Sequence, residues 1–141
     1  MKRHPYLIPF SRFHRSILFL ALIAKENAPK VKGYPEKIED KISYALEFYE
    51  EQLLPHFNSE RNKVFTVFTG KDSALDELIV SIEEERQIIC EGFEELKNDE
   101  SNFTQFHDLG EKLEKHVRRE ERELFQMIQA KCEGILSAQE T

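Results

Sequence analysis

Cysteine is scarce in this sequence: Cys90 and Cys132 are the only two among 141 residues. Two cysteines are too few for the disulfide framework of a small secreted domain, and each falls in a segment with helical periodicity. We therefore expect both thiols to be free and to pack as small hydrophobic side chains. Glycine and proline are also sparse, with five of each, which favours a few long helices over many short strands.

Excess positive charge and long apolar runs are lacking as well. The 20 Lys and Arg residues are outnumbered by 27 Asp and Glu residues, which gives a net charge of -7. This balance argues against binding to nucleic acid, whose phosphates require a basic surface, and against anionic membranes. The most apolar stretch, 16–24, is too short to cross a bilayer. We expect a cytoplasmic protein.

The high content of hydrophobic and charged residues predicts one strongly helical domain that covers residues 1–141. Hydrophobic residues make up 40% and charged residues 33% of the chain, and the apolar positions recur at helical spacing. No stretch shows the sustained alternation of a strand. The pattern predicts four helices, at roughly 12–26, 36–69, 73–97 and 102–134. Because the connections between them are short, we expect an all-α, antiparallel up-down-up-down four-helix bundle.

Local signals mark the ends of these helices and one irregularity. Ser11 can cap the first helix, and Asp72 or Ser73 can cap the third, because their side-chain oxygens accept hydrogen bonds from unpaired backbone N–H groups. Asn102 opens a capping box at the start of the fourth helix. Pro55 lies inside the second helix, where its missing N–H should kink or interrupt the helix.

A repeated motif carries polar residues on the apolar faces of the second and fourth helices. Its two copies are LLPHFNSERNKVF and LEKHVRREERELF, which share the pattern L-x-x-H-x-x-x-E-x-x-x-(V/L)-F, 60 residues apart. The first copy contains His56 and Glu60, and the second contains His116 and Glu120. Residues four apart on a helix are neighbours, with Cβ atoms roughly 5–6 Å apart. Each pair therefore offers a nitrogen and an oxygen that suit one metal ion, or a carboxylate shared by two.

The other two helices each offer one further ligand on the same face. His14 continues the apolar stripe of the first helix, and Glu85 lies between Ile82 and Ile89 on the third. In an antiparallel arrangement with a rise of about 1.5 Å per residue, Glu85 and His116 differ by only about 3 Å in height. Six groups are therefore expected in one layer of the bundle: His14, His56, Glu60, Glu85, His116 and Glu120.

Charge explains why such groups would occupy a hydrophobic interior. Burying a lone carboxylate costs several kcal/mol, and three carboxylates together repel one another. Two divalent cations would bring a charge of +4 against the -3 of the carboxylates, and hydroxide or oxide from solvent would balance the remainder. A single buried histidine is more often a packed core residue, and a single glutamate more often pairs with Lys or Arg. The repeated pair in matching context favours metal ligation.

Together these residues resemble the hemerythrin-like, or HHE cation-binding, family along nearly the whole chain. LIPFSRFHR is similar to the family's approach to its first-helix histidine, here His14, and the two repeats resemble its motifs on the second and fourth helices. The resemblance implies a four-helix bundle around a non-haem di-iron centre. Relatives usually carry E-H-(R/K)-x-(L/I) on the third helix. Here residues 84–88 read EERQI, so Glu85 stands in the place of the histidine, and Ser81 replaces a further histidine of the oxygen carriers.

The resemblance also implies a cofactor of two metal ions, iron with an oxo or hydroxo bridge, with manganese or zinc as the alternatives. Three carboxylates in the ligand set favour Fe(III) or Mn and work against reversible oxygen carriage. Alternatively, Glu85 points outward and leaves a coordination position open. In the implied centre, Glu60 and Glu120 are the bridges, and the terminal ligands are His14, His56, Glu85 and His116.

The function expected from this centre is the handling or sensing of O2, peroxide, nitric oxide or iron. The sequence shows no evident reductase domain, flavin site or P-loop, so turnover would need an external electron donor. Whether the protein is an enzyme is left open, as is its oligomeric state. Two alternatives stand beside this prediction: a metal-binding module without catalysis, whose folding depends on the metal, and a degenerate, metal-free helical interaction domain.

Overall fold

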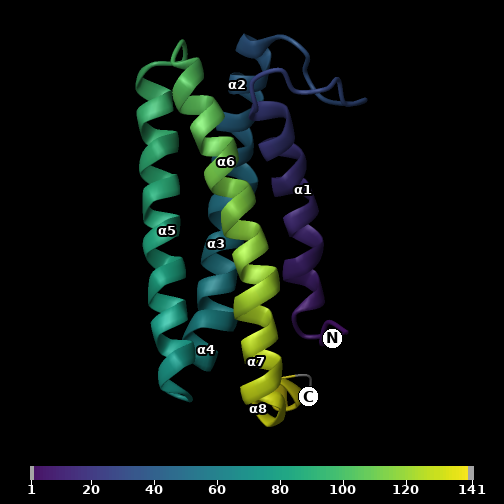
Figure 1. The fold of residues 1–141 in the computed structure, drawn as a ribbon, viewed down its shortest axis with the longest axis vertical. Coiled ribbons are helices and arrows are strands. Elements are labelled where there is room, and N and C mark those ends of the chain that lie inside the picture. The colour runs from purple at the N-terminus through teal and green to yellow at the C-terminus, as the bar shows by residue number, and fades with distance from the viewer. Residues whose placement is uncertain (1, 140–141) are drawn as a thin grey trace.

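The computed structural model describes residues 2–139, in which the regular elements are all helical and no strand occurs. Four long helical stretches lie side by side along the long axis of the molecule in Figure 1. None of the helices in the described part of the chain has the length and apolar content needed to span a membrane. The stretches are α1 (Ile8–Ala24), then α2 (Ile38–Phe48), α3 (Leu54–Glu60) and α4 (Thr66–Phe68) in succession, then α5 (Ser73–Asn98), and finally α6 (Phe103–Arg119) with α7 (Phe125–Lys131).

The described residues therefore form an all-α helical bundle, as the sequence predicted. A short additional helix, α8 (Glu133–Gln139), follows the fourth stretch, where the prediction had a single helix ending near 134. The two are separated at Cys132, whose backbone leaves the helical region with φ -128° and ψ 30°. The side chain of Cys132 is buried and its thiol is free.

Helix ends are set by proline and by short polar side chains. α1 begins at Ile8, before the predicted start at 12, because Pro9 suits the first turn, where backbone N–H groups have no partner. Ser11 consequently lies inside the helix and does not cap it. Asp72 caps α5 and Asn102 caps α6, each accepting a 3.0 Å hydrogen bond from a backbone N–H of the first turn.

Three π-helical turns widen the second and fourth stretches. The first ends just before Pro55, where the sequence predicted a kink, so the helix is already widened next to the residue that lacks an N–H. The second follows Glu60 directly, and the third begins at Glu120. A π turn holds one extra residue, which lets each glutamate share the buried face with Phe65 or Phe125, five residues later. The turns are η1 (Tyr49–Leu53), η2 (Arg61–Phe65) and η3 (Glu120–Leu124).

Two hydrophobic clusters fill the interior, and a layer of polar side chains separates them. One cluster includes Ile17, Leu53 and Leu113. The other includes Phe65 and Leu75. Between the clusters, each long stretch contributes a buried polar residue, so apolar side chains cover this layer at both ends. We call it the polar layer, and its members are His14, His56, Glu60, Arg86, His116 and Glu120.

Close packing between α1 and α6 holds one side of the polar layer in place. A Cβ atom added to Gly110 of α6 would lie 2.9 Å from the Cβ of Ala24 and 3.0 Å from the backbone oxygen of Ala21. A side chain at position 110 would therefore push α1 away. Glycine allows the two backbones to approach, and the same two helices carry His14 and His116.

Candidate metal centre

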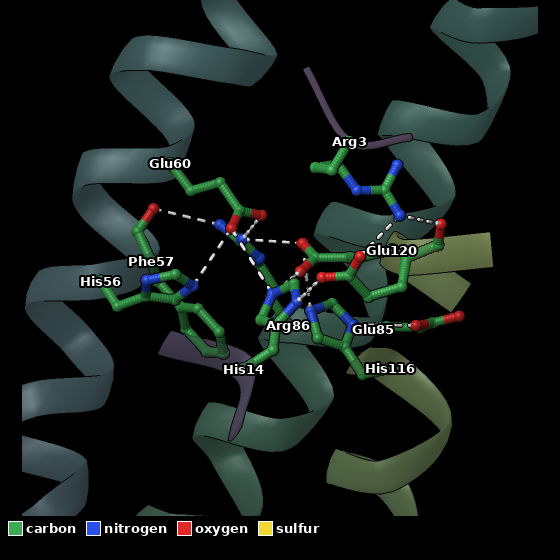
Figure 2. Close-up of polar contacts among 10 residues, drawn as sticks. Arg3, His14, His56, Phe57, Glu60, Glu85, Arg86, His116 and Glu120 are labelled. Carbon is green, nitrogen blue, oxygen red and sulfur yellow. Dashed lines mark hydrogen bonds and ion pairs between the residues drawn. The ribbon is translucent and has the colours of Figure 1, made fainter. Parts of the chain in front are cut away.

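The structure brings five of the six predicted ligands together in the polar layer. His14 comes from α1, His56 and Glu60 from α3, His116 from α6, and Glu120 from η3. Figure 2 shows their polar ends pointing toward one another. All five are buried, with at most 9% of each residue exposed. That they bind a metal stays a prediction, and their convergence is the arrangement such a site requires.

Three of these side chains form a tighter group. One ligand atom from each of His14, His56 and Glu60 lies within 4.8 Å of the other two. Nε2 of His56 is 3.1 Å from Oε2 of Glu60, and Nε2 of His14 is 3.9 Å from the same oxygen. All three atoms are buried, and none of them makes a hydrogen bond of normal geometry. Because buried polar atoms are rarely left unpaired, the group fits a cation held by two imidazoles and one carboxylate.

Carboxylates at the edge of the polar layer orient two of the imidazoles. Oε1 of Glu121 lies 2.8 Å from Nδ1 of His14, and Oε1 of Glu85 lies 2.9 Å from Nδ1 of His116. In each pair Nδ1–H donates to the carboxylate, so Nε2 is the nitrogen that faces the layer. Histidines that bind metals in proteins usually have such a partner, which fixes the orientation of the ring.

Glu120 lies between two histidines of the polar layer. Its Oε2 is 2.9 Å from Nε2 of His14, and its Oε1 is 3.6 Å from Nε2 of His116. Glu120 therefore directs one oxygen toward the group formed by His14, His56 and Glu60 and the other oxygen away from it. The first of these oxygens is available as a fourth ligand atom beside that group.

Glu85 is the one predicted ligand that the structure places outside the polar layer. Its side chain is 33% exposed and forms an ion pair with Arg119 in addition to its contact with His116. In Figure 2 its carboxylate lies beside the ring of His116, on the side away from the other ligands. This outward orientation is the alternative that the sequence had left open. In this position Glu85 orients a histidine and does not meet the other carboxylates.

Arg86 is the residue that α5 contributes to the polar layer, and it was not among the ligands predicted from the sequence. Only 2% of Arg86 is exposed. Nη2 donates to Oε1 of Glu60 and to Oε1 of Glu120, the latter at 3.0 Å, as Figure 2 shows. Nη1 donates to the backbone oxygen of Phe57 at 3.0 Å. The guanidinium carbon also lies 4.4 Å from the ring centroid of Phe57 and 4.3 Å from that of Phe65.

Comparison with known proteins supports the interpretation of this layer. Residues 11–128 match the family model described as the hemerythrin HHE cation binding domain. The chain belongs to this family. No curated protein and no solved structure matches it. A cation-binding family and a buried cluster of imidazole and carboxylate ligand atoms both point to a bound metal ion in this hemerythrin-family bundle.

The inward face of the third helix is one residue further along than the sequence predicted. Ile89 is buried, with 1% exposed, whereas Ile88 is 51% exposed. The residue of this segment that faces inward is therefore Arg86, next along the chain from Glu85. A signal for this was present, because Arg86 lies four residues after Ile82 and three before Ile89. Glu85 lies three residues after Ile82 and four before Ile89. Helical spacing from Ile82 and Ile89 alone is therefore compatible with either Glu85 or Arg86 facing inward.

The charges within the polar layer determine which of its side chains carry protons. Burial lowers the pKa of His14, but the adjacent carboxylates of Glu120 and Glu121 outweigh it and raise the pKa to about 10. Burial and the nearby charge on His14 lower the pKa of His56 to about 3. Burial raises the pKa of Glu60, whereas Arg86 holds that of Glu120 well below its ordinary range despite its burial. A bound cation would favour both ionised carboxylates and the neutral form of His14.

Proposed function

We propose that the protein binds iron in the polar layer through His14, His56 and Glu60, with Glu120 beside them, and that it handles or senses O2, peroxide or nitric oxide there. The observation that carries this proposal is the convergence of three buried ligand atoms, none of which makes a hydrogen bond of normal geometry. Two histidines and one carboxylate form the set that holds Fe(II) in many non-haem proteins while leaving positions open. Manganese and zinc are the alternative metals.

The residues around the ligands would support such a role. The ring of Phe13 stacks on that of His56, with 4.2 Å between centroids, and Phe125 stacks on His14 at 5.7 Å. These contacts and the hydrophobic clusters at both ends hold the imidazoles in position and keep bulk water out. A bound iron would supply an open coordination position and a change of oxidation state. Because the ligand atoms are buried, the site favours small molecules over larger substrates.

Partners and location are part of the proposal. Turnover with O2 or peroxide would require an external electron donor. The net charge of -7 favours neither nucleic acid nor an anionic membrane as a partner. We propose a cytoplasmic location, where small diatomic ligands and reducing partners are both available.

One observation favours a second candidate function, that of a metal-free helical interaction domain. Arg86 donates hydrogen bonds to both buried glutamates, Glu60 and Glu120, and so provides a cation in the layer without any metal. The bundle could then fold without an ion. Intermediate between the two proposals is a metal-binding module that buffers iron without reacting with a small ligand.

The test is the metal content of protein that is expressed with ample iron and purified without chelator. We expect at least about one ion per chain for the unaltered protein and under about 0.2 for His56→Ala, since a buried ligand is lost. His107→Ala is the matched control, because His107 lies outside the layer and contacts Glu111, and it should retain its iron. Less than about 0.2 ion in the unaltered protein would favour the metal-free domain. Iron without any spectral change on adding nitric oxide would favour the buffering module.

A further inference from the structure

We propose that the polar layer holds one metal ion and not two, and that the guanidinium of Arg86 takes the place of a second cation between Glu60 and Glu120. This inference rests on the metal-binding part of the proposed function and concerns the number of ions and the residues that set it. It departs from the di-iron centre that the sequence led us to expect.

The two buried glutamates divide their oxygens between two sides of the layer. Oε2 of Glu60 lies near Nε2 of His56 at 3.1 Å, and Oε2 of Glu120 lies 2.9 Å from Nε2 of His14. The Oε1 atoms of both glutamates accept hydrogen bonds from Nη2 of Arg86. One side of the layer therefore has two imidazoles and two carboxylate oxygens, and the other has a guanidinium.

The side that contains Arg86 has too few free ligand atoms for a second ion. Nε2 of His116 is buried there without a hydrogen-bond partner, but the nearest carboxylate oxygen, Oε1 of Glu120, is 3.6 Å away and already accepts from Arg86. Glu85, on the same helix as Arg86, contacts Nδ1 of His116 and does not face the layer. One imidazole alone does not make a metal site, since protein sites use three or four ligands.

Arg86 and a second ion would also compete for the same space and the same charge. A metal bound to Oε1 of Glu120 would lie about 2.1 Å from that oxygen, where a nitrogen of Arg86 lies at 3.0 Å. One divalent ion and the guanidinium together bring +3 against the -2 of Glu60 and Glu120. A second divalent ion would raise the excess further in a buried layer, where like charges are poorly screened.

The guanidinium is held in the layer by contacts that do not involve the glutamates. Nη1 donates to the backbone oxygen of Phe57 at 3.0 Å. The rings of Phe57 and Phe65 lie on the guanidinium at 4.4 and 4.3 Å, and the residue is 2% exposed. Leaving the layer would break all of these contacts, so an incoming ion is not expected to displace Arg86.

A single ion changes the chemistry that the site supports. One iron exchanges a single electron, whereas a pair can exchange two in one encounter. A lone iron held by His14, His56 and Glu60 therefore suits the binding of one diatomic ligand, such as nitric oxide, better than the two-electron reduction of O2. Arg86, next to both glutamates, would act as a positioning residue that keeps one oxygen of each directed toward the metal.

The test is to count iron per chain and to record the low-temperature electron paramagnetic resonance spectrum of the air-oxidised protein. An isolated high-spin Fe(III) gives a signal, whereas a bridged ferric pair couples and gives none. For the unaltered protein we expect about one iron per chain and a signal that accounts for it. Arg86→His removes the guanidinium and adds an imidazole near His116, and it should bind about two irons with most of the signal lost. Arg118→His, at an exposed arginine, is the matched control and should behave like the unaltered protein.

The outcomes separate the inference from the proposed function. No iron in the unaltered protein would overturn both, whereas two irons without a signal would overturn the inference and leave the proposed function standing. One iron in both the unaltered protein and Arg86→His would show that Arg86 does not exclude the second ion. If Arg86→His does not fold, Arg86→Lys provides the second comparison. Lysine keeps the positive charge but cannot bridge two carboxylates as the guanidinium does. An iron content that stays at about one per chain in Arg86→Lys would support exclusion of the second ion by charge.

Discussion

Nη2 of Arg86 donates a 3.0 Å hydrogen bond to Oε1 of Glu120, and each residue has at most 2% of its surface exposed. The same nitrogen also donates to Glu60. A buried cation thus joins the two glutamates that come from the repeated motifs on the second and fourth helical stretches. This contact ties together three of the four stretches of the bundle, and it links the stability of the fold to the properties of the site.

Arg86→Leu should destabilise the metal-free protein. The substitution leaves Glu60 and Glu120 buried next to one another without their cation, and removing one partner of a buried ion pair typically costs about 3–5 kcal/mol. Urea unfolding in the presence of a chelator measures the change. Arg118→Leu, at an exposed arginine whose partner is Glu114, should change the free energy of unfolding by less than about 0.5 kcal/mol. Equal effects of the two substitutions would mean that Arg86 does not neutralise the layer.

The fold could be predicted because its signals are strong and local. Apolar residues recur at helical spacing over long stretches, and Asp72 and Asn102 stand where helix caps are expected. The two copies of the motif placed His56, Glu60, His116 and Glu120 on buried faces, because residues four apart share a face of a helix whatever the rest of the bundle does.

Which residue of the third helix faces the interior could not be predicted from spacing in the same way. Glu85 and Arg86 both fit the spacing between Ile82 and Ile89, and a charged arginine is more often exposed than buried. Contacts with the other helices determine which of the two residues faces inward. The buried glutamates Glu60 and Glu120 stabilise a cation at the inward position, which Arg86 provides. Those partners are distant in sequence, so the pairing becomes visible only in the folded bundle.

The two histidines of the repeated motifs should differ in their effect on iron content. His56→Ala removes an imidazole from the group that includes Glu60, 3.1 Å away, and should abolish iron binding. His116→Ala removes an imidazole from the side that contains Arg86 and should retain most of the iron. Elemental analysis of both proteins, purified in parallel, measures the difference. Equal loss in the two variants would make His116 a ligand and would argue for a second ion.

Glu121→Gln should weaken metal binding although Glu121 is not expected to touch the metal. Its carboxylate accepts from Nδ1 of His14 at 2.8 Å, and loss of such a partner typically lowers metal affinity by about 10–100-fold. Competition with a chelator of known affinity measures the effect. Glu123→Gln is the control, because that side chain is 56% exposed and pairs with Arg119. Unchanged affinity in Glu121→Gln would mean that the orientation of His14 does not depend on this contact.

Gly110→Val should destabilise the bundle and loosen the site together. A Cβ at this position would lie 2.9 Å from that of Ala24, so α1 must move outward and carry His14 with it. Overpacking of this kind typically costs about 1–3 kcal/mol, which thermal unfolding measures. Gly134→Ala is the control, since nothing lies within 4 Å of its added Cβ, and it should not lower the melting temperature. A variant at 110 as stable as the unaltered protein would contradict the close approach of α1 and α6.

The most direct measurement is anomalous diffraction at the iron edge from crystals of the iron-loaded protein. We predict one strong peak in the polar layer, within bonding distance of Nε2 of His14, Nε2 of His56 and a carboxylate oxygen of Glu60, with the guanidinium of Arg86 still in contact with Glu120. A layer without any peak in crystals of iron-loaded protein, or a peak bound only through His116, would contradict this account of the site.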